Sequence, residues 1–296
     1  MISPNGNKLA LHFPQPPRRV ISLVPSLTES LFDLGFGGSV IGISDYCTQP
    51  AQELKELPHL GGPKNPNIEE IIALNPDLIL LNQEENTRQA VEALLEASMP
   101  VWITFPRSIR AALDTLWTLA GIYQSPMAAA RVETIERAVK WTELAHENKN
   151  PTRYFCPIWK GEAANGLQWW MTFNQDTYAA DVLRAIGGLN VFAGRMRRYP
   201  LEADLGQVEE EDSTNLDTRY PRVTLDEIRH AQPELILLPD EPFLFTETDK
   251  AEFLQALGDT PAGIQGRIQL LEGSLITWHG TRLARAMAEL PSIFSQ

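Results

Sequence analysis

Aromatic side chains are the residues of this chain whose types and spacing could most readily hold a ligand. Seven of the 24 aromatic residues fall between positions 154 and 178. The stretch from Trp159 to Trp169 contains glycines and no helical stripe, which predicts a loop after a strand. Flat rings on a loop suit a broad, partly apolar ligand, so Trp159, Trp170 and Phe173 are candidate binding residues. The alternative is that these rings only cover the core beneath a long loop.

Further candidates follow other predicted strands, where a short chain segment turns toward the next helix. Such loop ends present side chains at the edge of a parallel sheet, where open α/β proteins bind ligands. The candidates of this kind are Tyr46, Phe105, Arg107, Phe243, Phe245, Trp278, His279 and Arg282.

Catalytic and metal-binding patterns are missing from the sequence. It contains no GxSxG, no phosphate-binding loop with its lysine, no GxGxxG after a strand and no HExxH. The histidines are dispersed, and Cys47 and Cys156 have no CxxC spacing, so a bare metal site is not expected. His279 could serve as an axial ligand to a metal already held in a macrocycle, or it could be a loop histidine whose hydrogen bonds are satisfied.

Short apolar runs alternate with helical periods, which predicts α/β architecture. Ser26, Asn67 and Thr224 each precede a glutamate by three residues, which is the pattern of a capping box. Such helix starts offer free backbone N–H groups at the ends of strands, although they could also serve only to fix the helices. The predicted strands are 20–24, 40–43, 78–81, 101–104, 153–157, 234–238 and 268–271, and the predicted helices are 26–34, 68–74, 87–98, 176–186, 225–231, 249–257 and 280–290.

An internal repeat organises these elements. Residues 67–81 align with residues 224–238 at a constant offset of 157, with seven identities. Between the two copies, Ser125-Pro126 opens a helix-periodic stretch that ends near residue 148. The sequence therefore predicts two similar three-layer α/β lobes, residues 1–124 and 151–296, joined by one long helix at residues 125–150, with a ligand cleft between the lobes.

Composition excludes several classes of protein. The formal net charge of -13 argues against a nucleic-acid partner. No apolar run approaches the roughly 20 residues of a membrane-spanning helix. The first 19 residues carry no signal-peptide pattern, so a complete chain of this sequence would be cytoplasmic and an exported one would have lost its leader.

The runs RVISLVPSLTESLFDLGFG, VIGISDYC and LPHLGGPKNPNIEEIIALNPDLILL, together with RYPRVTLDEIRHAQPELILLP in the second half, resemble a known family. They are similar to the helical-backbone class of ABC-transporter substrate-binding proteins, the receptors for cobalamin and iron–siderophore complexes, and most similar to the cobalamin-binding members. The resemblance implies a non-catalytic periplasmic or extracellular receptor that holds one ligand between its lobes.

The resemblance also implies roles for particular residues. It places Ser26, Tyr46, Lys64, Tyr220 and the Trp278 loop at the ligand. It assigns Glu69 and Asp226, which are related by the repeat, to docking on the arginines of an ABC permease. Both positions also lie in the first turn of a predicted helix, where a carboxylate is favoured without any partner.

The resulting hypothesis is a monomeric binding protein, without a cofactor of its own, for a corrinoid or similar metal chelate. A receptor for an iron–siderophore complex or heme is one alternative. A leaderless cytoplasmic metal-chelate protein or enzyme is another, and it would need a titratable pair such as His279 with Glu162 or Asp240.

Overall fold

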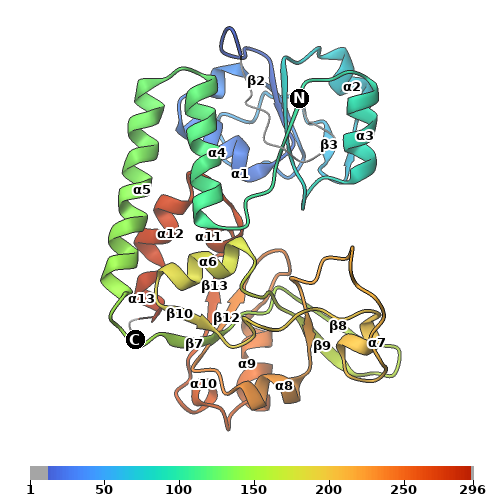
Figure 1. Cartoon of the computed structure of the whole chain (residues 1–296), viewed down its shortest axis with the longest axis vertical. Coiled ribbons are helices and arrows are strands. Elements are labelled where there is room, and N and C mark those ends of the chain that lie inside the picture. Colours follow the sequence, from blue (N-terminus) through green and yellow to red (C-terminus); the bar gives the residue numbers. More distant parts are fainter. Residues whose placement is uncertain (1–12, 295–296) are drawn as a thin grey trace. The chain divides into compact units, whose positions relative to one another are not determined.

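The computed structural model describes residues 13–294, so residues 1–12, which include most of the stretch without a signal-peptide pattern, lie outside it. The chain forms two compact units (Figure 1). The first unit is Met1–Ala138 with Trp278–Arg285, and the second is Val139–Thr277 with Ala286–Gln296. The division falls within two helices, α5 (Pro126–His146) and α12 (Leu283–Glu289), so each of these helices contributes to both units.

The first unit is built on a four-stranded parallel sheet in the order β2-β1-β5-β6. Every residue of β5 is buried, as expected for a central strand covered on both faces. Ile71 of α2 and Leu94 of α3 pack with Ile21 and Ile79 of the sheet in one core. The elements are β1 (Val20–Ser22), α1 (Pro25–Asp33), the 3-10 turn η1 (Gly37–Ser39), β2 (Val40–Ile43), β3 (Gly61–Gly62), β4 (Asn65–Pro66), α2 (Ile68–Ala73), β5 (Leu78–Asn82), α3 (Arg88–Glu96), β6 (Val101–Thr104) and α4 (Ile109–Ile122).

The second unit repeats this plan, with a parallel sheet in the order β10-β7-β12-β13. Counted along the chain, both sheets have the strand order 2-1-3-4, which agrees with the internal repeat and confirms the predicted α/β fold. A small antiparallel sheet, β11-β9-β8, is added to the second unit. The elements are β7 (Thr152–Phe155), β8 (Trp159–Glu162), β9 (Gln168–Met171), α6 (Tyr178–Ala185), β10 (Gly188–Asn190), α7 (Leu201–Asp204), β11 (Arg222–Val223), α8 (Leu225–Ala231), β12 (Leu235–Pro239), α9 (Glu247–Ala256), α10 (Pro261–Ile264), β13 (Ile268–Leu271), α11 (Ser274–Thr277) and α13 (Pro291–Phe294).

Two local expectations were wrong. The stretch from Trp159 to Trp169 is not a loop but the hairpin β8–β9. Gly161 belongs to strand β8 because it lies directly under the Trp169 ring, where any Cβ would come within 2.4 Å of Cζ2, and Gly166 lies in the hairpin turn at a φ of 83°. The capping box at Ser26 is also absent. Helix α1 begins one residue earlier, with Pro25 in its first turn and Val24 as an N-cap without a side-chain bond.

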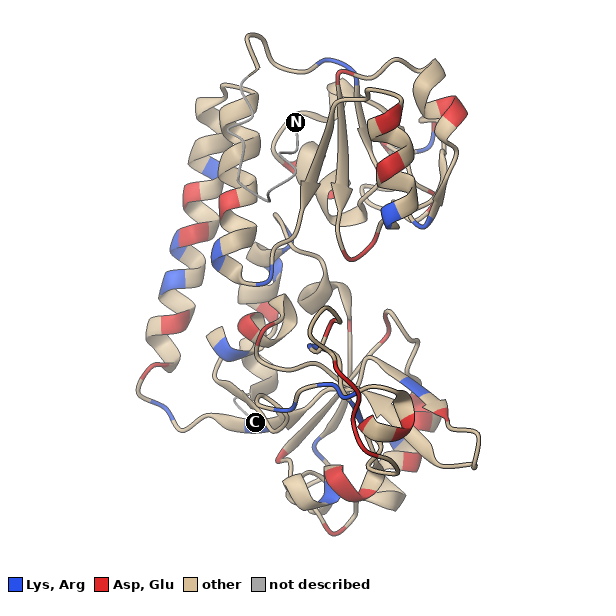
Figure 2. Cartoon of the chain, turned by 45° about the vertical axis from the view of Figure 1, so that its right-hand side comes forward, with Lys and Arg blue, Asp and Glu red and all other residues tan. Residues whose placement is uncertain are grey.

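Charged side chains are spread over the surface, and one acidic run stands out. Residues Glu209–Asp212 lie in an exposed loop of the second unit, which appears as a continuous red stretch in Figure 2.

Candidate functional site

Buried polar side chains gather in the first unit where β1 and β5 end. His279, only 5% exposed, places Nε2 3.0 Å from Nδ2 of Asn82 and Nδ1 3.4 Å from Oγ of Ser26. The Asn82 amide is oriented by the backbone N–H of Glu84, which donates to Oδ1 at 2.8 Å. The amide NH₂ therefore donates to Nε2, and Nδ1 carries the ring proton toward Ser26.

This environment keeps the His279 imidazole neutral. Burial lowers the pKa of His279 to about 4, because the charged imidazolium would lose its contact with water. Ligation of a metal through Nε2 would require breaking the contact with Asn82. His279 and Ser26 were predicted to be site residues, whereas Asn82 was missed, although its place at the end of an apolar strand was a usable signal.

The segment around His279 is fixed to helix α1 by an ion pair. The Arg282 guanidinium donates to both carboxylate oxygens of Glu29, at 2.8 and 2.5 Å, and lies 4.4 Å from the centre of the Trp278 ring. A bidentate pair of this kind neutralises the arginine and fixes its plane. Within the first unit Arg282 therefore orients Trp278.

Four further predicted residues lie on loops of the first unit. Tyr46 is 66% exposed, and its ring rests over Gly62 in β3, where an added Cβ would lie 3.4 Å from Cε2. Lys64 is exposed in the turn between β3 and β4. After β6, the exposed Arg107 guanidinium lies 5.6 Å from the centre of the Phe105 ring. These loops offer a flat phenol face and two exposed cations to a ligand.

The second unit presents an aromatic cluster beside β8. Trp159 is 43% exposed and meets Phe243 edge to face, with ring centres 5.4 Å apart. Phe243 in turn packs against Phe245 at 4.9 Å. Lys160 is held below them by Asp249 at 2.5 Å. Lys160 was missed, and no sequence pattern indicates the Lys160–Asp249 pair.

Two predicted aromatic residues of the second unit face its interior. Trp170 lies in the hydrophobic core with its ring 5.5 Å from that of Phe253, and Phe173 is fully buried. Both support the strands beneath the exposed rings. Tyr220 is half-buried just before β11, beside the Arg219 guanidinium at 5.1 Å.

The two predicted docking residues occupy equivalent positions. Glu69 is exposed in the first turn of α2, whose N-cap Asn67 accepts from the Glu70 N–H at 3.2 Å. Asp226 is exposed in the first turn of α8, and it pairs within the helix with Arg229 at 2.9 Å. Each carboxylate therefore points to solvent from a capped helix.

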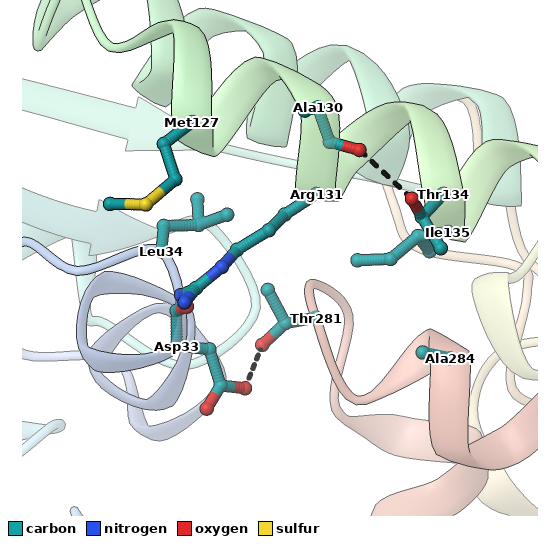
Figure 3. Close-up of a pocket in the computed structure, with 9 residues that line it drawn as sticks. All are labelled: Asp33, Leu34, Met127, Ala130, Arg131, Thr134, Ile135, Thr281 and Ala284. Atoms are coloured by element: carbon teal, nitrogen blue, oxygen red, sulfur yellow. Dashed lines mark hydrogen bonds between the residues drawn. The ribbon is translucent and has the colours of Figure 1, made fainter.

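An open hollow also lies in the first unit, between α1 and the first turns of α5 (Figure 3). Arg131 reaches across it to the main-chain carbonyl of Asp33 at the end of α1, and the Asp33 carboxylate accepts from Thr281 at 2.6 Å. These bonds satisfy the polar groups at the helix end. The hollow lies at the opposite end of α1 from Ser26, so it is separate from the candidate site.

The described part of the chain holds no group of three or more His, Cys, Asp or Glu side chains placed to bind a metal ion. Among residues 13–294 we also find no helix both long and apolar enough to cross a membrane.

Comparison with curated proteins finds relatives that bind vitamin B12. The vitamin B12-binding protein of Yersinia pestis (strain Pestoides F) is 29% identical over 187 residues, which cover 63% of this chain and 64% of that relative. The match thus spans less than two thirds of the relative's length.

Solved structures share the fold at lower identity. A periplasmic vitamin B12-binding protein of Vibrio cholerae superposes with a TM-score of 0.73 at 20% identity, covering 95% of this chain and 98% of the other. The apo form of a periplasmic heme-binding protein of Roseiflexus sp. RS-1 gives 0.70 at 23% identity, covering 94% and 97%. The sequence model of the periplasmic binding proteins matches residues 20–273, and the chain therefore belongs to the periplasmic binding protein family.

Proposed function

We propose that this protein binds a corrinoid or a related metal chelate and delivers it to an ABC importer, acting as a monomer outside the cytoplasm and catalysing no reaction. Family membership and the likeness to a vitamin B12-binding protein support this proposal.

One observation carries the choice of ligand. Each unit holds a largely exposed aromatic ring on a fixed support, Tyr46 over Gly62 and Trp159 against Phe243. Rings that are already ordered lose little conformational entropy on binding, and their flat faces suit a macrocycle.

The polar groups nearby fit the same ligand. His279 is neutral and Arg282 is paired with Glu29, so the polar groups fixed at this edge of the first unit add no unbalanced charge. Neutral hydrogen-bonding groups would match the amide side arms that surround a corrin ring.

The test is calorimetric titration with cyanocobalamin, hemin and ferrichrome. We expect cyanocobalamin to bind most tightly, and Trp159→Ala and Tyr46→Ala each to weaken it at least about tenfold, because each removes one supported ring. Trp141→Ala is the matched control, since Trp141 is 70% exposed on α5 and is not among the candidate site residues. No heat and no thermal shift with any of the three chelates would overturn the proposal, and tighter binding of ferrichrome or hemin would replace the corrinoid by that class.

A further inference from the structure

Five arginines gather in one part of the second unit, on two segments that lie side by side. The buried carboxylate of Asp204 joins these segments. Its Oδ1 accepts from the backbone N–H of Arg198 at 3.0 Å, and its Oδ2 accepts from the backbone N–H of Arg222 at 2.6 Å. The five residues are Arg195, Arg197, Arg198, Arg219 and Arg222.

Only some of these cations are neutralised. Arg195 pairs with Asp204 at 3.0 Å, and Arg219 pairs with Asp217 at 2.6 Å. Among the residues that the structure describes, no carboxylate oxygen lies within 4 Å of the guanidinium nitrogens of Arg197 or Arg222. Instead Arg197 lies over the Tyr199 ring at 4.0 Å, and Arg222 donates to the carbonyl of Tyr220 at 2.9 Å. Both side chains are half-buried, so solvent only partly screens their charges.

A flat surface adjoins this pair of cations. On the sheet β11-β9-β8, Val223 is paired with Trp170 and both are buried in the core, so Arg222 extends from the opposite face. Its guanidinium lies 5.7 Å from the centre of the Trp169 ring. Trp169 is held in place across Gly161, whose missing side chain makes room for the indole.

Several N–H donors in this region lack acceptors. Nε of Arg197, Nε of Arg198 and Nε1 of Trp169 are buried, and none has a hydrogen-bond partner. Buried donors without acceptors are uncommon, and each carries a free-energy cost. A ligand rich in acceptor atoms would remove this cost. Burial and the like charge of Arg197 also lower the pKa of Arg222, and the charge of Asp204 offsets only part of this shift.

We propose that Arg197 and Arg222 form an oxyanion subsite, with Trp169 as an adjoining platform, that takes a carboxylate or phosphate group carried by the bound chelate. A guanidinium fork matches both groups in a bidentate geometry. The claim that a bound metal chelate carries this group rests on the proposed function. The claim that the two arginines bind an oxyanion does not.

The subsite is tested first with a free oxyanion. Calorimetry with pyrophosphate should show binding to the wild-type protein, and Arg197→Gln and Arg222→Gln should each weaken it at least about tenfold. Arg184→Gln removes an equal charge from α6 of the same unit and should stay within about twofold, because Arg184 is bound to Asp181 and Glu143. Circular dichroism checks that each variant is folded, and Arg222→Lys, which keeps the charge, should recover part of the affinity. No pyrophosphate binding by the wild type, or equal losses in all three glutamine variants, would overturn the subsite.

The second arm identifies the carrier. Cyanocobalamin has a phosphodiester that cobinamide lacks, and hemin has two carboxylates that its dimethyl ester lacks. If the subsite binds the phosphate of the ligand, Arg197→Gln and Arg222→Gln lose affinity for cyanocobalamin and keep their affinity for cobinamide. Selective loss for hemin over its ester identifies a carboxylate. If the arginine variants lose affinity equally for cyanocobalamin and cobinamide, and equally for hemin and its ester, the subsite does not recognise a phosphate or carboxylate of the ligand. Absence of binding by all four chelates contradicts the proposed function, and the pyrophosphate result then decides the subsite by itself.

Discussion

His279 is a deeply buried side chain with a titratable ring. The stability of the first unit should therefore fall at acid pH because of this one side chain. Its pKa of about 4 in the folded protein lies below the value of about 6.5 for an unfolded chain. The unfolded state therefore binds the proton first as the pH falls. The stabilisation from neutral His279 is complete above pH 6.5 and is lost progressively toward pH 4.

Between pH 7.5 and pH 5, we expect the wild-type protein to lose about 2 kcal/mol of unfolding free energy more than His279→Gln does, because only the wild type must keep this ring neutral. Urea unfolding at the two pH values measures the difference. His230→Gln, which changes an exposed histidine on α8, should behave as the wild type does. The assignment fails if His279→Gln shows the same acid sensitivity as the wild type.

The exposure of single side chains could be predicted from the sequence where their neighbours are close in the chain. Tyr46 and Trp159 lie two or three residues beyond predicted strands, and the structure exposes both rings. The bond between Arg282 and Glu29 joins residues 253 positions apart, and no local pattern could indicate it. The buried positions of Trp170 and Phe173 depend on which face of the β8–β9 hairpin packs on the core. The sequence could not indicate that face, because it predicted a loop in place of the hairpin.

Helix starts show how local sequence competes with its surroundings. Asn67 and Thr224 cap α2 and α8 as predicted, and Thr224 forms the full capping box with Glu227. The same pattern at Ser26 does not cap α1, because Pro25 has no N–H to satisfy and its fixed φ already suits the first turn. Ser26 instead lies within helix α1, and its hydroxyl contacts His279.

The capping box of α8 gives an expected stability change. Thr224→Ala should lower the free energy of unfolding by about 1 kcal/mol, since the Glu227 N–H would lose the Thr224 oxygen that accepts from it at 3.3 Å. Thr224→Ser keeps the hydroxyl and should cost only a few tenths of that amount. Chemical denaturation of both variants measures the cap, and equal losses in the two would show that the Thr224 methyl group matters instead.

At the scale of the whole chain, duplication explains why so much of the architecture could be predicted. The offset of 157 indicated two copies of one unit, and both parallel sheets have the same strand order. The return of Trp278–Arg285 to the first unit could not be predicted. Its fit against α1 depends on tertiary contacts, such as Gly280 lying where a Cβ would meet Ser30 Oγ at 2.2 Å.

The duplication also places one exposed carboxylate at the same helix position in each unit, Glu69 and Asp226, and the proposed docking on a permease uses both. Glu69→Gln and Asp226→Asn should each weaken binding to the cognate importer, reconstituted in lipid nanodiscs, by about tenfold, because each removes one charge from a rim contact. Glu69 has no ion-pair partner among the residues described, whereas Asp226 already pairs with Arg229, so the loss at Glu69 should be the larger. The double variant should show the product of the two losses if the two carboxylates bind separate arginines of the permease. Affinity for the chelate should not change in any of them.

Glu133→Gln, which neutralises an exposed carboxylate on α5, is the control. A loss of importer binding there equal to that at Glu69 would mean that the importer responds to overall negative charge rather than to the two repeated positions.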